Sequence, residues 1–199
     1  VLNETDTCRT LVEPKLRASG WEDDPHSYTE QYAITAGRIV VMGSQAQRRR
    51  PKFADYLLRH TRDFAIAVVE AKTPDKPAGT GLEQAKDYAQ LLGLKFAYAT
   101  NGNDIVEFDF LKGQERTLTA FPSPAELWQR LQEGEGLSDE QSERLTTPSN
   151  LTGGRPPRYY QEIAINRAIQ AILQGQKRVL LTMATGTGKT PTAFQICWK

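Results

Sequence analysis

The amino-acid sequence predicts an α/β protein in which one complete domain is followed by the beginning of a second. Three observations lead to this fold class. Helical and strand patterns alternate over residues 1–132, the composition turns to Gly, Ser, Thr, Glu and Pro over residues 133–156, and an apolar segment leads into a glycine-rich turn within residues 157–199. We therefore expect a domain, a linker and the N-terminal part of another domain.

The first domain is expected to open with a helix over residues 4–19, kinked near Pro14. Its inward face, taken at helical spacing, carries Glu4, Cys8, Leu11, Val12 and Leu16. Three β-rich stretches follow at residues 32–42, 53–59 and 64–72, the first two joined by a basic loop at 43–52. Because their connections are short, we expect these strands to pair antiparallel.

The second half of this domain contains a loop at residues 74–80 and an amphipathic helix over 82–92 that ends at Gly93. Strands at 95–100 and 105–110 flank Asn101-Gly102-Asn103, a strong hairpin signal. A helix over 124–132 completes the domain. The order of helix, three strands, helix and two strands predicts a mixed sheet flanked by helices.

After the linker we expect a helix over residues 159–173, which ends at Gly175, and a buried strand at 178–183. A glycine-rich turn then opens a last helix. This order of strand, glycine-rich turn and helix is the setting that a phosphate-binding turn requires.

Composition limits the possible classes of protein. Hydrophobic residues make up 39% of the chain and charged residues 25%, which is ordinary for a soluble globular protein. No apolar run approaches the roughly 20 residues that span a bilayer, and residues 1–6 do not resemble a secretory signal. Cys8 and Cys197 show neither metal-ligand spacing nor a disulfide framework. We therefore expect a cytoplasmic protein without a membrane segment.

The net charge of +1 does not by itself indicate a nucleic-acid partner, but its distribution is uneven. Arg48, Arg49, Arg50 and Lys52 cluster before a predicted strand. Such a cluster can neutralise phosphates without reading base sequence. Taken alone, such a cluster is more typical of a solvated hairpin tip, and both interpretations stay open.

The glycine-rich turn predicts a nucleotide site. Gly186 and Gly188 allow backbone N–H groups to surround a phosphate, and the helix N-terminus adds partial positive charge. Lys189 can reach the β- and γ-phosphates of ATP, and Thr190 can bind Mg²⁺ through its hydroxyl. The predicted phosphate-binding residues are Thr185, Gly186, Thr187, Gly188, Lys189 and Thr190.

Arg158-Tyr159-Tyr160-Gln161 resembles the adenine-reading motif of superfamily 2 helicases, in which Gln161 would contact adenine. A helix start with aromatic anchors is the alternative interpretation. No acidic motif or arginine finger follows in the nine residues after Thr190. Because phosphoryl transfer depends on such groups, we expect this stretch not to hydrolyse ATP efficiently by itself.

A second set of polar residues predicts a metal-dependent nuclease. Period-two alternation places Glu70 and Lys72 on the same face as Phe64, Ile66 and Val68, and Asp55 lies on the preceding strand. Asp55 and Glu70, with the carbonyl of Ala71, offer the oxygen ligands that Mg²⁺ prefers. Lys72 would orient a water molecule or stabilise charge on a phosphate. A plain ion pair is the alternative.

Gln84 and Tyr88 lie on one helical face, beside the apolar stripe, and resemble the Q-x-x-x-Y motif of the RecB-like branch of PD-(D/E)xK nucleases. That resemblance implies a restriction-endonuclease-like fold with Asp55, Glu70, Lys72, Gln84 and Tyr88 as its catalytic set. It also implies an extra acidic metal ligand at Glu4. The sequence departs from the family pattern at Ala54, where proline is usual.

Taken together, the ordered motifs resemble the restriction subunit of type I restriction-modification systems. The resemblance covers nearly the whole chain: Glu4, Asp55, Glu70-x-Lys72, Gln84-x-x-x-Tyr88, Thr100-Asn101-Gly102, Gln161 and Met183 to Thr190. It implies a RecA-like superfamily 2 motor after the nuclease domain, and a type I site-specific deoxyribonuclease that uses Mg²⁺ and ATP. Its implied partners are double-stranded DNA and the methyltransferase and specificity subunits.

Two alternatives remain open at this point. One is a nuclease-helicase fusion from another defence or repair system. The other is a catalytically inactive nuclease fold that holds DNA or serves in assembly. Mg²⁺ binding at Asp55 and Glu70 would distinguish the second alternative, because an inactive site should bind no metal.

Overall fold

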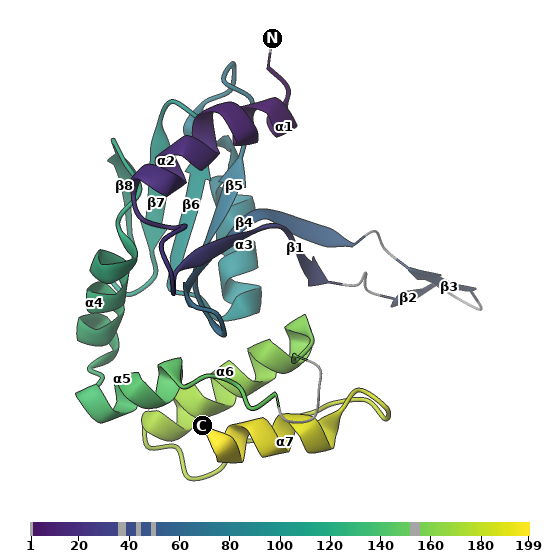
Figure 1. Ribbon diagram of the computed structural model, residues 1–199. Coiled ribbons are helices and arrows are strands. Elements are labelled where there is room, and N and C mark those ends of the chain that lie inside the picture. Colours follow the sequence, from purple (N-terminus) through teal and green to yellow (C-terminus); the bar gives the residue numbers. More distant parts are fainter. Residues whose placement is uncertain (1, 36–38, 43–44, 49–50, 152–155) are drawn as a thin grey trace.

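The computed structural model describes residues 2–35, 39–42, 45–48, 51–151 and 156–199 (Figure 1). Its centre is a six-stranded sheet in the order β1-β4-β5-β6-β7-β8. All neighbouring strands are antiparallel except β5 and β6, so the predicted mixed sheet is confirmed. The strands are β1 Ser27–Thr35, β4 Lys52–Thr61, β5 Phe64–Ala71, β6 Phe96–Thr100, β7 Ile105–Asp109 and β8 Gln114–Leu118.

The N-terminal helix is continuous but changes its winding. It runs as α1 Glu4–Thr7, a π-helical turn Cys8–Val12 and α2 Glu13–Ala18. Pro14 lies in the first turn of α2, directly after the π-helical turn, and has no N–H to donate to that turn. The helix therefore accommodates Pro14 by widening one turn before it. Of the predicted inward residues, Cys8, Val12 and Leu16 are buried and Leu11 is partly buried, whereas Glu4 is exposed, so the prediction is wrong for Glu4.

The predicted strand over residues 32–42 is wrong, because two strands of different sheets occupy it. β1 ends at Thr35, whereas β2 Ile39–Met42 pairs with β3 Gln45–Arg48 in a separate two-stranded sheet. This hairpin projects from the body of the molecule (Figure 1). The predicted loop at 43–52 therefore contains β3. Residues 49 and 50 and the side chain of Arg48 lie outside the described part of the chain, so the basic cluster stays a prediction.

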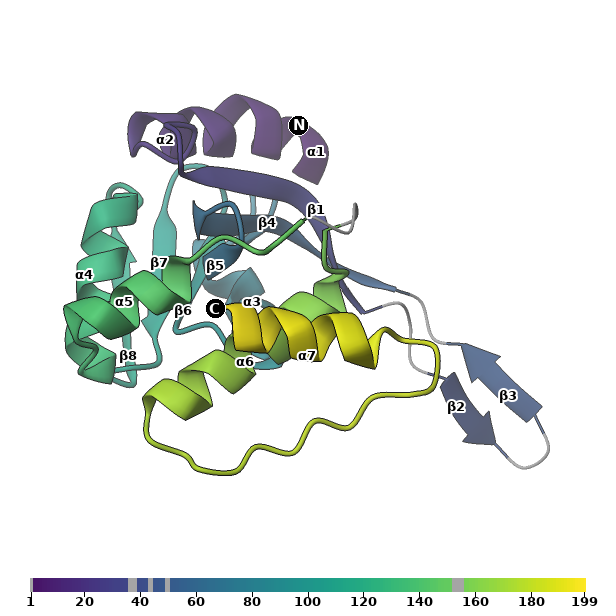
Figure 2. The same ribbon diagram turned by 60° about the horizontal axis from the view of Figure 1, so that its bottom comes forward.

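Helices cover both faces of the large sheet (Figures 1 and 2). The N-terminal helix and α4 Pro124–Glu135 cover one face, where they contribute Val12, Leu16 and Leu127 to a core with Tyr56 and Phe96. Helix α3 Leu82–Leu92 covers the other face, over Val68 and Ala97. It ends as predicted at Gly93, whose φ of 76° suits glycine.

A β-bulge corrects one detail of β5. Leu58 pairs with Ala67 and Arg59 with Ala65, so Ile66 is an extra residue on its strand. Phe64 and Ile66 therefore pack in the first core, whereas Val68 packs in the second. The predicted single face from Phe64 to Lys72 is divided at this point.

Part of the predicted linker is helical. Helix α4 extends to Glu135, and α5 Asp139–Thr146 begins with a capping box formed by Ser138 and Gln141. Leu145 of α5 is buried in the first core. A polar composition hid this helix because it buries only one narrow side. The division into two domains at this segment stays a prediction.

Beyond the linker, α6 Tyr159–Leu173 forms as predicted and packs beside α7 Lys189–Trp198 (Figure 2). Residues 178–183 do not form the predicted strand, and Leu180 is 91% exposed. A strand needs a neighbouring strand to pair with, and no described strand lies beside this segment. Within the described residues, no helix is long and apolar enough to cross a membrane.

Candidate nuclease and nucleotide sites

The β4–β5 hairpin brings Asp55 and Glu70 together. Tyr56 pairs with Val69, which places the preceding Asp55 across from Glu70. The backbone N–H of Ala71 donates to Asp55 Oδ2 at 2.8 Å, so the Asp55 carboxylate is tied to the strand that carries Glu70. The proximity that the short hairpin turn predicted is therefore present.

Lys72, the residue after β5, contacts the carboxylates of Glu70 and Glu4. Its Nζ donates to Glu70 Oε1 at 2.8 Å and lies 3.7 Å from Glu4 Oε1. Glu4 thus reaches the cluster from the N-terminal helix, as the resemblance implied. The ion pair with Glu70 is also the alternative that the sequence left open, so contact alone does not decide the function of Lys72.

Burial makes this cluster electrostatically unusual. The Glu70 side chain is 4% exposed, and no donor among the described residues reaches its buried Oε2 atom. Burial, reinforced by the nearby Asp55 charge, raises the Glu70 pKa to about 7. Burial also raises the pKa of Asp55. Two carboxylates that resist ionisation side by side are the arrangement that a bound cation would stabilise.

The metal ligands predicted from the sequence fit a divalent cation only in part. Asp55 and Glu70 supply carboxylate oxygens, and Glu70 Oε2 is buried without a hydrogen-bond partner among the described residues. However, no group of three or more His, Cys, Asp or Glu residues in the described ranges is arranged to hold a metal ion. Glu4 contacts Lys72 and so lies at the margin of the cluster. The geometry favours a site centred on Asp55 and Glu70.

Helix α3 supplies the last two predicted residues. Gln84 Nε2 donates to the Tyr88 hydroxyl at 3.0 Å, as their spacing allows. The Tyr88 ring is buried in the second core, so the expectation that it lies beside the apolar stripe is wrong for this residue. The large aromatic ring of Tyr88 gains stability from burial, while its hydroxyl group keeps Gln84 as a hydrogen-bond partner.

Two residues at this site were not predicted from the sequence. Gln31 Nε2 donates to Asp55 Oδ1 at 2.9 Å. Gly81 lies against the cluster, since a Cβ added to it would be 3.0 Å from Glu70 Cγ and 3.5 Å from Lys72 Cε. Glycine before a helix is a common turn signal, but only the fold shows what lies beside it. Gln31 carried no sequence signal at all.

The phosphate-binding turn is formed by residues 185–188 and leads into α7, which begins at Lys189. Gly186 and Gly188 have φ values of 78° and 84°, so both use the freedom that glycine provides. Thr187 Oγ1 donates to the carbonyl of Ala184 at 2.6 Å and closes the turn. The two glycines therefore have the conformations that the predicted turn needs.

Gln161 lies beside this turn, and the contact with adenine that the helicase-like motif implied stays a prediction. Its Nε2 donates to Thr187 O at 3.0 Å, and its Oε1 accepts from the backbone N–H of Arg158 at 2.8 Å. The Gln161 amide thus links the first turn of α6 to the phosphate-binding turn. To donate to adenine, its Nε2 would have to give up a partner, because it also donates to Gly188 O at 3.4 Å.

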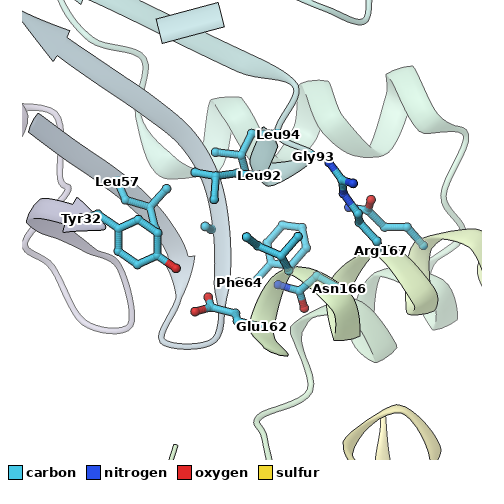
Figure 3. Close-up of a pocket in the computed structure, with 12 residues that line it drawn as sticks. Tyr32, Leu57, Phe64, Leu92, Gly93, Leu94, Glu162, Asn166 and Arg167 are labelled. Atoms are coloured by element: carbon cyan, nitrogen blue, oxygen red, sulfur yellow. The ribbon is translucent and has the colours of Figure 1, made fainter. Parts of the chain in front are cut away.

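The two sites are connected through α6. Arg59, on the strand that carries Asp55, pairs with Glu162 at 2.5 Å, and their side chains are 11% and 19% exposed. Arg167 donates to the carbonyls of Gln90 and Leu91 at 2.7 and 3.1 Å, at the end of α3. Figure 3 shows this junction, where Arg167 points to Gly93 and Glu162 lies near Tyr32. Helix α6 is therefore bonded to β4, which carries Asp55, and to the end of α3, which carries Gln84 and Tyr88.

Comparison with known proteins gives a consistent result. Residues 155–199 match a family described as the type III restriction enzyme, res subunit. The chain is 40% identical to the type I restriction enzyme EcoAI endonuclease subunit of Escherichia coli, over 100% of this chain and 25% of that protein. A 42-residue stretch is 52% identical to the EcoKI endonuclease subunit of E. coli strain K12, covering 21% of this chain and 4% of that protein.

A solved structure agrees with these sequences. A fragment structure assigned to an HsdR subunit of a type I restriction enzyme from Vibrio vulnificus YJ016 superposes with a TM-score of 0.87. It is 58% identical, and the match covers 99% of this chain and 38% of that one. The matched part is thus well under half of these relatives. The resemblance stated from the motifs is confirmed: the chain is a homologue, over its whole length, of the endonuclease (HsdR) subunits of type I restriction enzymes.

Proposed function

We propose that residues 1–132 form a Mg²⁺-dependent PD-(D/E)xK endonuclease domain that cuts duplex DNA within the motor subunit of a type I restriction enzyme. One observation carries the proposal. Asp55 and Glu70 meet across the β4–β5 hairpin, and Glu70 presents a buried oxygen that has no partner among the described residues. A buried polar atom without a partner is costly, so a ligand that binds it supplies what the fold lacks.

Asp55 and Glu70 would hold the metal ion, which when bound would polarise a phosphodiester and acidify a water molecule. Lys72 would neutralise the charge that develops on the phosphate; its contact with Glu70 Oε1 at 2.8 Å supports this by keeping its Nζ beside the proposed metal ligands. Gln84 and Tyr88 hold each other on α3, and the Tyr88 ring anchors that helix in the second core. Glu4 would act at the margin, through Lys72.

The second part of the proposal is that residues 157–199 belong to a RecA-like motor. Its support is the φ values of Gly186 and Gly188, the helix that begins at Lys189, and the match of residues 155–199 to a restriction-enzyme family. Lys189 and Thr190 would bind the phosphates and Mg²⁺ of ATP. The methyltransferase and specificity subunits would be its partners, and cleavage would follow ATP-driven translocation along DNA.

Calorimetric titration of Mg²⁺ into the full-length subunit without ATP tests the proposal. We expect binding that is lost in Asp55→Asn and Glu70→Gln. Glu83→Gln is the matched control, because Glu83 is 83% exposed and pairs only with Lys86 among the described residues. Binding that survives both site variants would contradict the metal assignment. Absence of binding in the wild-type subunit would favour an inactive fold that holds DNA.

A further inference from the structure

The backbone of Gln31 is in a conformation that few side chains adopt. Its φ is 47°, and it is the one non-glycine residue with positive φ among those the structure describes. It lies inside β1, where neighbouring pairs are Glu30 with Tyr56 and Tyr32 with Ala54, and the ladder skips Gln31 itself. A left-handed conformation is unfavourable for glutamine, so other interactions must hold it there.

The interaction that Gln31 makes is with the nuclease cluster. Its amide donates to Asp55 Oδ1 at 2.9 Å, while the Ala71 N–H donates to Asp55 Oδ2 at 2.8 Å. The Asp55 carboxylate is therefore held from two strands, by one backbone donor and one side-chain donor. Each carboxylate oxygen has a second lone pair, so these two bonds fix the carboxylate without preventing it from binding a cation.

We propose that Gln31 is a positioning residue that orients Asp55 for metal binding, which rests on the proposed nuclease function. Strained backbone tends to occur at functional sites, where the surrounding structure over-determines it. Donors that hold a metal-ligating carboxylate affect metal affinity and activity about 10- to 100-fold when removed. Gln31 acts through Asp55 in this assignment and does not itself contact the metal or DNA.

The surroundings of Gln31 support an orienting function over a purely structural one. Gln31 is exposed and lines a cleft of about 360 Å³ together with Glu4, Arg9, Glu13, Glu30 and Asp55. An exposed glutamine buries little apolar area, so packing does not explain why it is held in a strained conformation. We attribute the strained conformation of Gln31 to its hydrogen bond with Asp55.

Two substitutions separate the donor from the backbone. Gln31→Met keeps the length of the side chain and the strain but removes the donor. Gln31→Gly removes the donor and also relieves the strain, because glycine accepts a positive φ. Glu30→Gln is the matched control, since Glu30 is the adjacent exposed residue of the same strand and lines the same cleft. All variants are made in the full-length subunit.

Calorimetry with Mg²⁺ alone, plasmid cleavage by the assembled enzyme and thermal denaturation are measured for each variant. We expect Mg²⁺ affinity and cleavage rate to fall about 10- to 100-fold in both Gln31 variants and to persist in Glu30→Gln. The melting temperature of Gln31→Gly should not fall, because relief of strain offsets the loss of the hydrogen bond.

The possible outcomes distinguish this inference from the proposed function. If the wild-type subunit binds Mg²⁺ and both Gln31 variants bind it equally well, Gln31 does not position Asp55. The same conclusion follows if Gln31→Met keeps wild-type affinity and cleavage while Gln31→Gly loses them, because the donor is then irrelevant. If the wild-type subunit itself binds no Mg²⁺, the proposed function is wrong and this inference is wrong with it.

Discussion

The proposed nuclease region and the proposed phosphate-binding region of this chain are built in opposite ways. Asp55, Glu70 and Lys72 come from paired strands, and Glu70 is buried in a way that shifts its pKa. The phosphate-binding turn is a local segment in which Gly186, Lys189 and Thr190 are all exposed. Side chains on paired strands are buried by the fold of their own sheet. A local turn needs neighbouring elements to enclose a ligand. The following predictions test this contrast.

The largest expected effect is on cleavage. Asp55→Ala, Glu70→Ala or Lys72→Ala in the assembled enzyme should lower the rate of DNA cleavage by at least about 100-fold, because each removes a charge from the reacting centre. ATP hydrolysis should stay close to the wild-type rate. Plasmid cleavage and phosphate release measured in parallel check this prediction. A variant that cuts at the wild-type rate would show that the residue is not part of the site.

Lys189→Ala should act on ATP hydrolysis, which the three nuclease-site variants leave close to the wild-type rate. ATP hydrolysis and translocation by the full-length subunit should be lost, because the lysine charge no longer meets the β- and γ-phosphates. Cleavage that depends on translocation should stop as well, while Mg²⁺ binding at Asp55 and Glu70 persists. Normal ATPase activity in this variant would rule out the phosphate-binding assignment.

The junction between the regions is tested by Arg59→Ala. This change leaves Glu162 largely buried without its partner, which should lower the free energy of unfolding by about 3 kcal/mol. Arg144→Ala is the control, because Arg144 and Glu140 form an exposed pair whose loss should cost about 0.5 kcal/mol or less. Urea denaturation of the chain measures both. Equal effects would mean that α6 is not fixed to the sheet through this pair.

A smaller effect is expected at Gly81. A Cβ there would lie 3.0 Å from Glu70 Cγ, so Gly81→Ala should displace the Glu70 side chain by a few tenths of an ångström. We expect cleavage to fall roughly tenfold with little change in melting temperature. Gly79→Ala is the matched control in the same short 3-10 helix, Ala78–Gly81, because nothing lies within 4 Å of its added Cβ. Equal cleavage by the two variants would refute the positional argument.

The last predicted effect concerns pH and appears only when no metal is bound. The Glu70 pKa of about 7 is above the ordinary value of 4.5, so the folded protein holds this proton more tightly than the unfolded chain. Stability from this group is therefore present at low pH and is lost as pH rises through about 7. Without metal at pH 8, Glu70→Gln should raise the free energy of unfolding by about 1–3 kcal/mol. At pH 4 the two proteins should be equal, and a constant difference would contradict the shift.

Local signals in the sequence were sufficient for several parts of the fold. Helix α3 and its end at Gly93 follow from periodicity and one glycine. The turn at Asn101 follows as well, because its side-chain oxygen accepts from the N–H groups of Asn103 and Asp104. The cluster of Asp55, Glu70 and Lys72 could be predicted because a short hairpin brings its strands together.

Long-range pairing explains the errors. Strand β8 was missed because Gln114–Leu118 is a polar edge strand with almost no buried residue. The strand predicted at 178–183 has the right pattern but no described neighbour to pair with. Gln31 could not be found because its importance depends on register and on a positive φ that no pattern encodes. The hydrophobic pattern predicts which secondary structure a segment prefers. Strand pairing and its register decide which side chains lie next to each other.

The β2–β3 hairpin has a consequence for how this domain can vary. Thr35 and Lys52 are already partners in the β1–β4 ladder, so the pairing of β1 with β4 is complete without the hairpin. Among the described residues between them, β2 and β3 pair with each other and add no strand to the six-stranded sheet. Insertions or deletions there change only the length of a closed loop, which costs little free energy per added residue. A change in the length of this arm should therefore leave the Asp55 carboxylate, three residues beyond Lys52, in place.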